Sequence, residues 1–309
     1  MTFLKRHRFA IAFALLAVAT IFGLYNLFSS DWRGALRFWS GRGGALGGAL
    51  ALQSADVALD GFLWMWLLSG FGIRPGVRRG TMIFLSGFAG LLLPAQLGRL
   101  IRSEEIARLG HGRFSDAAKA EVVLVVVSGV AAFALMAGVF AGLWRGWAAL
   151  PAAAGVIGGF LCCATVALRV VPRLSSQFPP HYFLRPSTIA VACLAVVGWV
   201  INGFCLFLIL RGSVSDLALW QTLLVAPSNM LVGAASGMPG GLGVVEGYLG
   251  TMFHSMNVPG EHLALAVASF RLITFWVWIP AGWLALTWLG RLPDAEEASG
   301  DMPTNDHVR

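Results

Sequence analysis

The sequence predicts an all-α, polytopic membrane protein, and two observations carry this prediction: the composition and the spacing of the apolar segments. Apolar residues make up 57% of the 309-residue chain, charged residues only 12%, and the mean hydropathy is +0.75. A water-soluble domain would need far more polar surface. Apolar runs of roughly 20 residues, enough for a helix to cross about 30 Å of hydrocarbon, recur along most of the chain. Because strand-like alternation is absent from the sequence, we expect the backbone groups to be satisfied within helices.

Nine apolar segments are expected to form helices, near residues 9–28, 45–70, 81–98, 122–143, 148–168, 187–210, 218–236, 244–257 and 263–289. The first follows the basic stretch Lys5-Arg6-His7-Arg8. It is too long for the apolar region of a signal peptide and no A-x-A site follows, so we predict an uncleaved first helix. After Gly290 the chain becomes acidic and rich in small polar residues, which predicts a disordered cytoplasmic tail over 290–309. Residues 1–289 are then a single transmembrane domain.

Two of these segments run into helix-breaking residues within apolar surroundings. One reaches Pro94-Ala95-Gln96-Leu97-Gly98, and the other reaches Gly237-Met238-Pro239-Gly240-Gly241-Leu242-Gly243. Unwound backbone at membrane depth survives only where protein or a water-filled cavity shields it. We therefore expect two broken, re-entrant hairpins, interrupted at Pro94 and Gly98 and at Pro239. The other interpretation is nine plain crossings with coincidental Pro-Gly breaks.

An internal repeat accompanies the two breaks. Shifting the chain by 142 to 145 residues places Asp60-Gly61-Phe62 on Asn202-Gly203-Phe204 and Pro94-x-x-Leu97-Gly98 on Pro239-x-x-Leu242-Gly243. Each unit, about 45–143 and 187–289, would contain a spanning helix, a broken hairpin and a second spanning helix. The two hairpins would open to opposite sides, an inverted arrangement that many transporters use to alternate access.

The basic residues predict how such a bundle is oriented. If each hairpin enters and leaves on one side, the spanning helices start near residues 9, 45, 122, 148, 187 and 263, and both chain ends lie in the cytoplasm. The positive-inside rule supports this orientation, in a bacterial inner membrane. The residues that become cytoplasmic are Arg74, Arg78, Arg79, Arg99, Arg102, Arg108, Arg113, Lys119, Arg169, Arg173 and Arg185, whereas Arg33, Arg37, Arg42, Arg145 and Arg211 lie outside.

Arg271 and Glu246 are the first candidates for a lipid-headgroup site. Arg271 lies about ten residues into the last apolar segment, too deep for comfortable snorkelling, so it needs a partner or an anionic ligand. The partner could be Glu246 in a fixed ion pair, or the ligand could be a headgroup phosphate. Glu246 follows Gly240, Gly241 and Gly243, near the start of a half-helix whose free N–H groups suit an anion. Glu246 could instead cap these donors or bind a proton.

Further polar residues fall in the first half of the chain. Arg99 and Arg102 lie on one helix face after Gly98, which fits either a cytoplasmic headgroup site or an ordinary positive-inside loop. Asp56 and Asp60 are four residues apart within an apolar segment, where carboxylates are costly, so we expect them, with Asn202, to line a polar pathway.

Several function classes are excluded by what the sequence lacks. The net charge of +7 comes from short basic segments between apolar runs, so no nucleic-acid partner is expected. The sequence contains no H-E-x-x-H, C-x-x-C, Walker or G-x-S-x-G motif, so we predict neither a metal site, nor a cofactor, nor catalytic residues. The protein is predicted not to be an enzyme.

The stretch from Ser236 to Gly247, S-G-M-P-G-G-L-G-V-V-E-G, followed by Phe270-Arg271-Leu272, resembles the lysylphosphatidylglycerol synthase transmembrane, or flippase-like, family. The stretch from Leu93 to Arg102, L-P-A-Q-L-G-R-L-I-R, is similar to the earlier proline-glycine motif of that family. The resemblance covers most of residues 45–289 and concerns the membrane half alone, without the aminoacyl-transfer domain to which some members are joined.

The charges of the first motif depart from the family pattern. Gln96 and Arg99 stand where such families usually carry an arginine and a glutamate, and Val125 and Val126 stand where they carry acidic and basic residues. The resemblance implies movement of an anionic phospholipid or a polyprenyl-phosphate-linked lipid between leaflets. Another interpretation is a non-transporting accessory subunit that presents lipid to a membrane glycosyltransferase or to a hopanoid or cell-envelope pathway. A membrane enzyme partner and a homo-oligomer stay open, and a membrane transferase is the third hypothesis.

Overall fold

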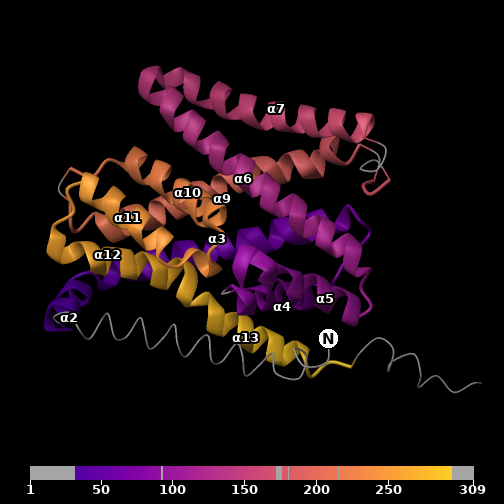
Figure 1. The fold of residues 1–309 in the computed structure, drawn as a ribbon, viewed down its shortest axis with the longest axis horizontal. Helices are drawn as coiled ribbons and strands as arrows, with labels where there is room; N and C mark the ends of the chain where they lie inside the picture. Colours follow the sequence, from indigo (N-terminus) through magenta and orange to yellow (C-terminus); the bar gives the residue numbers. More distant parts are fainter. Residues whose placement is uncertain (1–31, 92, 172–175, 180, 215, 294–309) are drawn as a thin grey trace, which may run out of the picture.

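The computed structural model describes residues 32–91, 93–171, 176–179, 181–214 and 216–293. Throughout these ranges the regular elements are helices and no strand occurs, which confirms the all-α prediction. The predicted first helix at 9–28 and nearly all of the predicted tail at 290–309 lie outside the described residues. Figure 1 gives the arrangement of the described helices.

Most helices follow the predicted apolar segments, but α2 and α5 lie outside them and the segment predicted at 263–289 is divided by a π-turn. In chain order they are α2 (Trp32–Ser40), α3 (Gly43–Ser69), α4 (Val77–Ser86), η1 (Gly87–Gly90), η2 (Pro94–Arg99), α5 (Leu100–Arg108), α6 (Phe114–Trp144), η3 (Gly146–Ala148), α7 (Ala149–Val170), η4 (Tyr182–Leu184), α9 (Pro186–Leu210), α10 (Leu219–Ser236), η5 (Pro239–Gly241), α11 (Val244–Ser255), α12 (Gly260–Arg271), the π-turn η6 (Leu272–Trp276) and α13 (Trp278–Leu289). Helix α6 begins eight residues before its apolar segment, because its polar first turns are supported by an ion pair between Asp116 and Lys119. The segment predicted at 81–98 is divided among α4, η1 and η2.

Four helices in the described part of the chain are long and apolar enough to cross a membrane: Phe114–Trp144, Gly146–Val170, Pro186–Leu210 and His262–Leu289. The protein is therefore a multi-pass membrane protein. Helix α3 has 27 residues, which corresponds to about 40 Å at 1.5 Å per residue. It is less apolar than these four helices, because Gln53, Asp56 and Asp60 lie within it.

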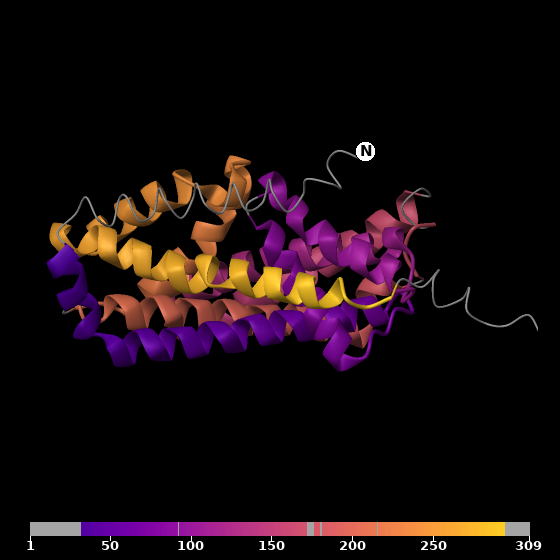
Figure 2. The ribbon, with the colours of Figure 1, turned by 90° about the horizontal axis from the view of Figure 1, so that it is seen from below.

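The long helices lie lengthwise beside one another. Helix α3 packs along α9, and α6 packs against both α7 and α9. Figure 2 shows α3 and α9 side by side along the long axis, with α12 and α13 running in the same general direction above them. Helix α7 packs mainly on α6 and leaves most of its surface uncovered.

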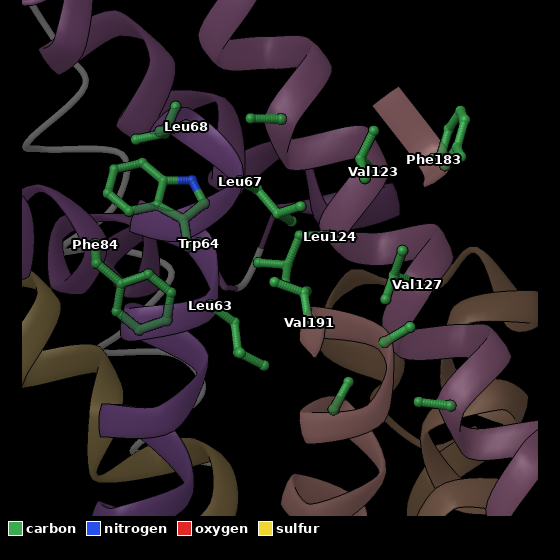
Figure 3. Close-up of a cluster of buried hydrophobic side chains, with 14 of the residues drawn as sticks. Leu63, Trp64, Leu67, Leu68, Phe84, Val123, Leu124, Val127, Phe183 and Val191 are labelled. Carbon is green, nitrogen blue, oxygen red and sulfur yellow. The ribbon is translucent and has the colours of Figure 1, made fainter. Parts of the chain in front are cut away.

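The buried side chains form two clusters, one in each half of the fold. The first joins α3, α4, α6 and α9, and Figure 3 shows Trp64 and Phe84 packed near Leu63, with Val123, Leu124 and Val191 across the interface. The second joins α2, the end of α9, α10, α11 and α12. Burial of these apolar side chains fixes the helices that carry the two helix interruptions.

Both predicted interruptions are present. The chain leaves its helix after η1 and restarts at Pro94, and it leaves α10 after Ser236 and restarts through η5. The two short helices η2 and η5 pack against each other, although they are far apart in the sequence. The fold therefore brings the two Pro-Gly segments together, with the side chains of Leu97 and Met238 about half exposed.

Candidate functional site

The backbone is tightly packed around the first interruption because glycines replace side chains there. A Cβ atom on Gly98 would collide with the backbone of Gly90, and one on Gly282 of α13 would collide with the backbone of Ala89. Glycine permits such close approach because it has no side chain. Gly98, predicted as a break, lies within η2, which continues into α5, and the contact between η1 and η2 requires a glycine there.

The second interruption depends on left-handed backbone. Four of its glycines, Gly237, Gly240, Gly241 and Gly243, have positive φ values between 59° and 81°. Side chains with a Cβ atom rarely adopt this conformation, which explains the Gly-rich sequence after Met238. Helix α11 then starts at Val244.

Arg271 and Glu246 form an ion pair beside this interruption. The Nε atom of Arg271 lies 2.8 Å from Oε1 of Glu246, and its Nη2 atom donates a hydrogen bond to the carbonyl of Gly240 at 2.9 Å. The guanidinium also lies over the ring of Phe275, 4.2 Å from its centre. The Arg271 side chain is 9% exposed, whereas that of Glu246 is 33% exposed. The carboxylate of Glu246 can therefore be reached from outside the protein.

Glu246 also caps helix α11. Its Oε2 atom accepts a hydrogen bond from the backbone N–H of Gly243 at 2.7 Å. Of the roles that the sequence left open, both the ion pair and the cap are present, because the two carboxylate oxygens serve different partners. A ligand anion that approached Arg271 would compete with Glu246 for the same guanidinium.

A second buried ion pair holds the first interruption. Arg102 donates from Nε to the carbonyl of Phe84 at 2.8 Å and from Nη1 to Oε2 of Glu121 at 3.3 Å. The two side chains are only 3% and 4% exposed, and the guanidinium lies 4.0 Å from the centre of the Phe84 ring. Arg102 therefore faces the protein interior, where it joins α5 to α4 and α6, and a contact with a headgroup would require this pair to open.

The predicted polar pathway is a hydrogen-bonded cluster between α3 and α9. Gln53 donates to Oδ2 of Asp56 at 3.1 Å and accepts from the side-chain amide of Asn202 at 3.2 Å. Asp56 packs against Gly198 of α9, where a Cβ atom would lie 2.8 Å from its Oδ1 atom. Asp60, one turn further along α3, interacts electrostatically with Arg99 and Arg102.

The fold thus places the predicted residues in separate groups. Arg271, Glu246, Gly240 and Gly243 form one group, and Arg102 belongs to another. Gln53 and Glu121 were not predicted from the sequence. Glu121 directly precedes the apolar segment at 122–143, so its sequence position resembles that of a loop carboxylate. Within the described part of the chain, no group of three or more His, Cys, Asp or Glu side chains is placed to hold a metal ion.

Comparison with known protein families gives a match that covers most of the chain. The family model described as the lysylphosphatidylglycerol synthase TM region matches residues 8–282, a range that contains both interruptions and both buried ion pairs. A search of curated proteins found no match. The matching model describes a membrane region, and no model of a catalytic domain matches. Since the match covers most of the sequence, the chain belongs to the lysylphosphatidylglycerol synthase transmembrane-region family.

Proposed function

We propose that this protein is a lipid translocase that moves an anionic phospholipid or a polyprenyl-phosphate-linked lipid between the leaflets of a bacterial inner membrane. One observation carries the proposal: two helix interruptions pack against each other in a multi-pass bundle, each beside a buried arginine. Irregular backbone at membrane depth is typical of transporter substrate sites, where two broken segments face each other. Family membership supports the same class of function.

The packing supports an inverted repeat of the units 45–143 and 187–289. Helix α6, the last of the first unit, packs on α10 of the second, and α13 packs on α4 of the first. Within the units, α5 packs on α6 as α11 packs on α12, and α3 packs on α6 as α9 packs on α12. The pairs α3 with α9 and η2 with η5 would each lie on the axis between the units. We therefore treat α4 to α5 and α10 to α11 as equivalent re-entrant hairpins.

The two buried ion pairs occupy corresponding places in these units with the charges exchanged. In the first unit the arginine, Arg102, follows the interruption and the carboxylate, Glu121, lies on the last helix. In the second unit the carboxylate, Glu246, follows the interruption and the arginine, Arg271, lies on the last helix. Each ion pair joins a hairpin to the final helix of its unit, and we call Arg102–Glu121 the first pin and Glu246–Arg271 the second pin. A hairpin could move away from that helix where a ligand replaces one partner of the pin.

The second pin is the one that a headgroup can replace. Glu246 is a third exposed, whereas both partners of the first pin are buried. A lipid phosphate can offer the Arg271 guanidinium the oxygen atoms that Glu246 supplies, with the backbone at Gly240, Gly241 and Gly243 open to close approach. In the first unit, Arg99 is the partly exposed cation that would meet the headgroup at the other opening, and Arg102 would keep its hairpin in place.

The proposal is tested by reconstitution into liposomes. Movement of fluorescent phosphatidylglycerol and of a fluorescent polyprenyl-phosphate analogue is followed for the unmodified protein, for Arg271→Ala and for Arg145→Ala. Arg145 is an exposed arginine at the connection from α6 to α7, so it controls for loss of a positive charge. We expect movement in the unmodified protein and in Arg145→Ala, and a loss of at least about tenfold in Arg271→Ala, which corresponds to about 1.4 kcal/mol.

The lipid that moves identifies the headgroup class. Equal movement in all three proteins would contradict the assignment of Arg271. If neither lipid moved with the unmodified protein, the translocase proposal would fail in favour of the accessory-subunit hypothesis. Copurification with a membrane glycosyltransferase would then be the next observation to seek.

A further inference from the structure

The surroundings of Asp60 contain more negative than positive charge. On α3 it is coupled to Asp56, one turn away. The charged groups that act on it from other elements are Arg99 on η2, Arg102 on α5 and Glu121 on α6. Three carboxylates therefore share two guanidinium groups. Arg102 and Glu121 are buried, whereas Asp60 is half-buried. If all of them are ionised, one negative charge is left over.

Asp60 is the carboxylate of this cluster without a hydrogen-bond partner in the described part of the chain. Asp56 accepts hydrogen bonds from the side chains of Gln53 and Asn202, and Glu121 pairs with Arg102. The partners of Asp56 and Glu121 favour their ionised forms, because hydrogen bonds and opposite charges stabilise a carboxylate. Asp60 has only electrostatic neighbours, so the excess charge is most costly there.

A second observation marks this region as a site rather than as a group of acids alone. Two buried polar atoms beside Arg102 have no hydrogen-bond partner among the described residues: Oε1 of Glu121 and Nε1 of Trp64. Their residues are 3% and 0% exposed. Glu121 pairs with Arg102 through its other oxygen, and the Trp64 ring, one turn along α3 from Asp60, has its centre 5.9 Å from the Arg102 guanidinium. Buried polar groups without partners beside one charge indicate a place that binds protons or small polar ligands.

We propose that Asp60 is a proton-binding site and that its protonation is coupled to lipid movement. A proton on Asp60 removes the excess charge, which is costly on a helix that packs among membrane-spanning helices. An anionic headgroup that approached Arg99 would add a negative charge to the same cluster, so its arrival favours proton uptake at Asp60. Proton and anionic headgroup are then taken up together. This inference rests on the proposed translocase function, to which it adds the coupling ion.

The first test measures lipid movement against a pH gradient. Liposomes carry fluorescent phosphatidylglycerol on the face that is acidified by about one pH unit, with the unmodified protein, Asp60→Asn or Glu104→Gln. Glu104 is an exposed carboxylate on α5 and serves as the matched control. We expect the gradient to accelerate movement about fivefold or more in the unmodified protein and in Glu104→Gln, the lower end of usual coupling between two sites.

The asparagine imitates a permanently protonated aspartate, so Asp60→Asn should move lipid at a rate that does not depend on the gradient. Movement in the unmodified protein that ignores the gradient would overturn the inference, and so would an unchanged gradient response in Asp60→Asn. These outcomes leave the translocase proposal standing, whereas an absence of lipid movement in the unmodified protein contradicts that proposal itself.

A second test needs neither transport nor a variant. Dicyclohexylcarbodiimide modifies protonated carboxyl groups in apolar surroundings, and the adduct is located by mass spectrometry of the unmodified full chain. We expect modification of Asp60 that decreases as the pH is raised, because the reagent needs the protonated carboxyl group. Absence of the adduct at Asp60 at every pH tested would overturn the proton-binding site.

Discussion

At the residue scale, Gly240 combines two constraints that only glycine meets. Its φ is +59°, and a Cβ atom would lie 2.6 Å from Cζ of Phe275, the ring beneath the Arg271 guanidinium. Its carbonyl accepts the hydrogen bond from Arg271. The backbone conformation at this glycine therefore determines where the arginine is held.

We predict that Gly240→Ala lowers the free energy of unfolding by about 2 kcal/mol or more, from left-handed strain plus the clash with Phe275. Gly247→Ala is the matched control, because Gly247 lies inside α11 with open space around its Cα atom. That change should be neutral or stabilising by up to about 1 kcal/mol. SDS-induced unfolding in mixed micelles measures both. Equal stability of the two variants would show that the left-handed conformation is not essential.

At the element scale, the pin between Arg102 and Glu121 fastens the first hairpin to α6. Removing one partner of a buried pair leaves the other charge uncompensated, so Arg102→Met or Glu121→Met should each cost about 3 to 5 kcal/mol of unfolding free energy. Replacing both by methionine should cost much less than the sum of the two single changes, because no buried charge is then left.

The exposed pair of Asp116 and Lys119 on the same helix is the comparison for this double-mutant cycle. Its side chains are 31% and 24% exposed, so Lys119→Met should cost less than about 1 kcal/mol. The same unfolding assay serves all four variants. If the costs of Arg102→Met and Glu121→Met simply added in the double variant, the pair would not be the feature that holds the hairpin.

The positions of the helices follow from the sequence, because a change from apolar to polar residues marks where each helix leaves the membrane. The segment predicted at 187–210 is α9, Pro186–Leu210, almost residue for residue. Polar first turns are harder to predict, since the stability of the start of α6 comes from side-chain pairing rather than from apolar character. The two interruptions were predictable because each segment combines proline with glycine, whereas the single proline Pro227 lies inside helix α10 without ending it.

The partners of the charged side chains could be predicted only in part. Arg271 lies deep in an apolar segment and needs a partner there, so an ion pair with Glu246 was one of two interpretations of the sequence. The pairing of Arg102 with Glu121 depends on how the hairpin folds back on α6, and the position of Glu121 at a segment edge gave no sign of it. Contact between η2 and η5 depends on the packing of the whole bundle.

At the scale of the whole molecule, hydrogen bonds and packing join the helix ends into two groups. At one end, Arg42 donates to the carbonyl of Gly212 at 2.6 Å. At the other, Arg185 donates to the carbonyl of Gly70 at 3.2 Å. The chain near residue 73 packs at Gly112, and Arg108 donates to the carbonyl of Leu292. Figures 1 and 2 show α2 and α5, which lie beside these two groups in the chain, towards opposite ends of the long axis.

The described basic residues are distributed unequally between these two ends. The end that contains Gly70 and Gly112 carries Arg74, Arg78, Arg79, Arg108, Arg113, Arg169, Arg185 and Arg291, whereas the other carries Arg37, Arg42, Arg145 and Arg211. Because cytoplasmic loops are enriched in Lys and Arg, the first end should face the cytoplasm. The orientation stays the prediction made from the sequence, and it puts the connection between α6 and α7 outside.

Single cysteines test this orientation. Arg113 and Arg145 are exposed at opposite ends of α6, so Arg113→Cys and Arg145→Cys are compared in a chain whose four native cysteines are replaced by alanine. We predict that a membrane-impermeant maleimide labels Arg145→Cys in intact cells and labels Arg113→Cys only after the membrane is opened, because helix α6 separates the two positions by about 45 Å at 1.5 Å per residue. The reverse pattern would invert the protein in the membrane. Labelling of both positions in intact cells would contradict a spanning α6, and with it the bundle that encloses the two interruptions.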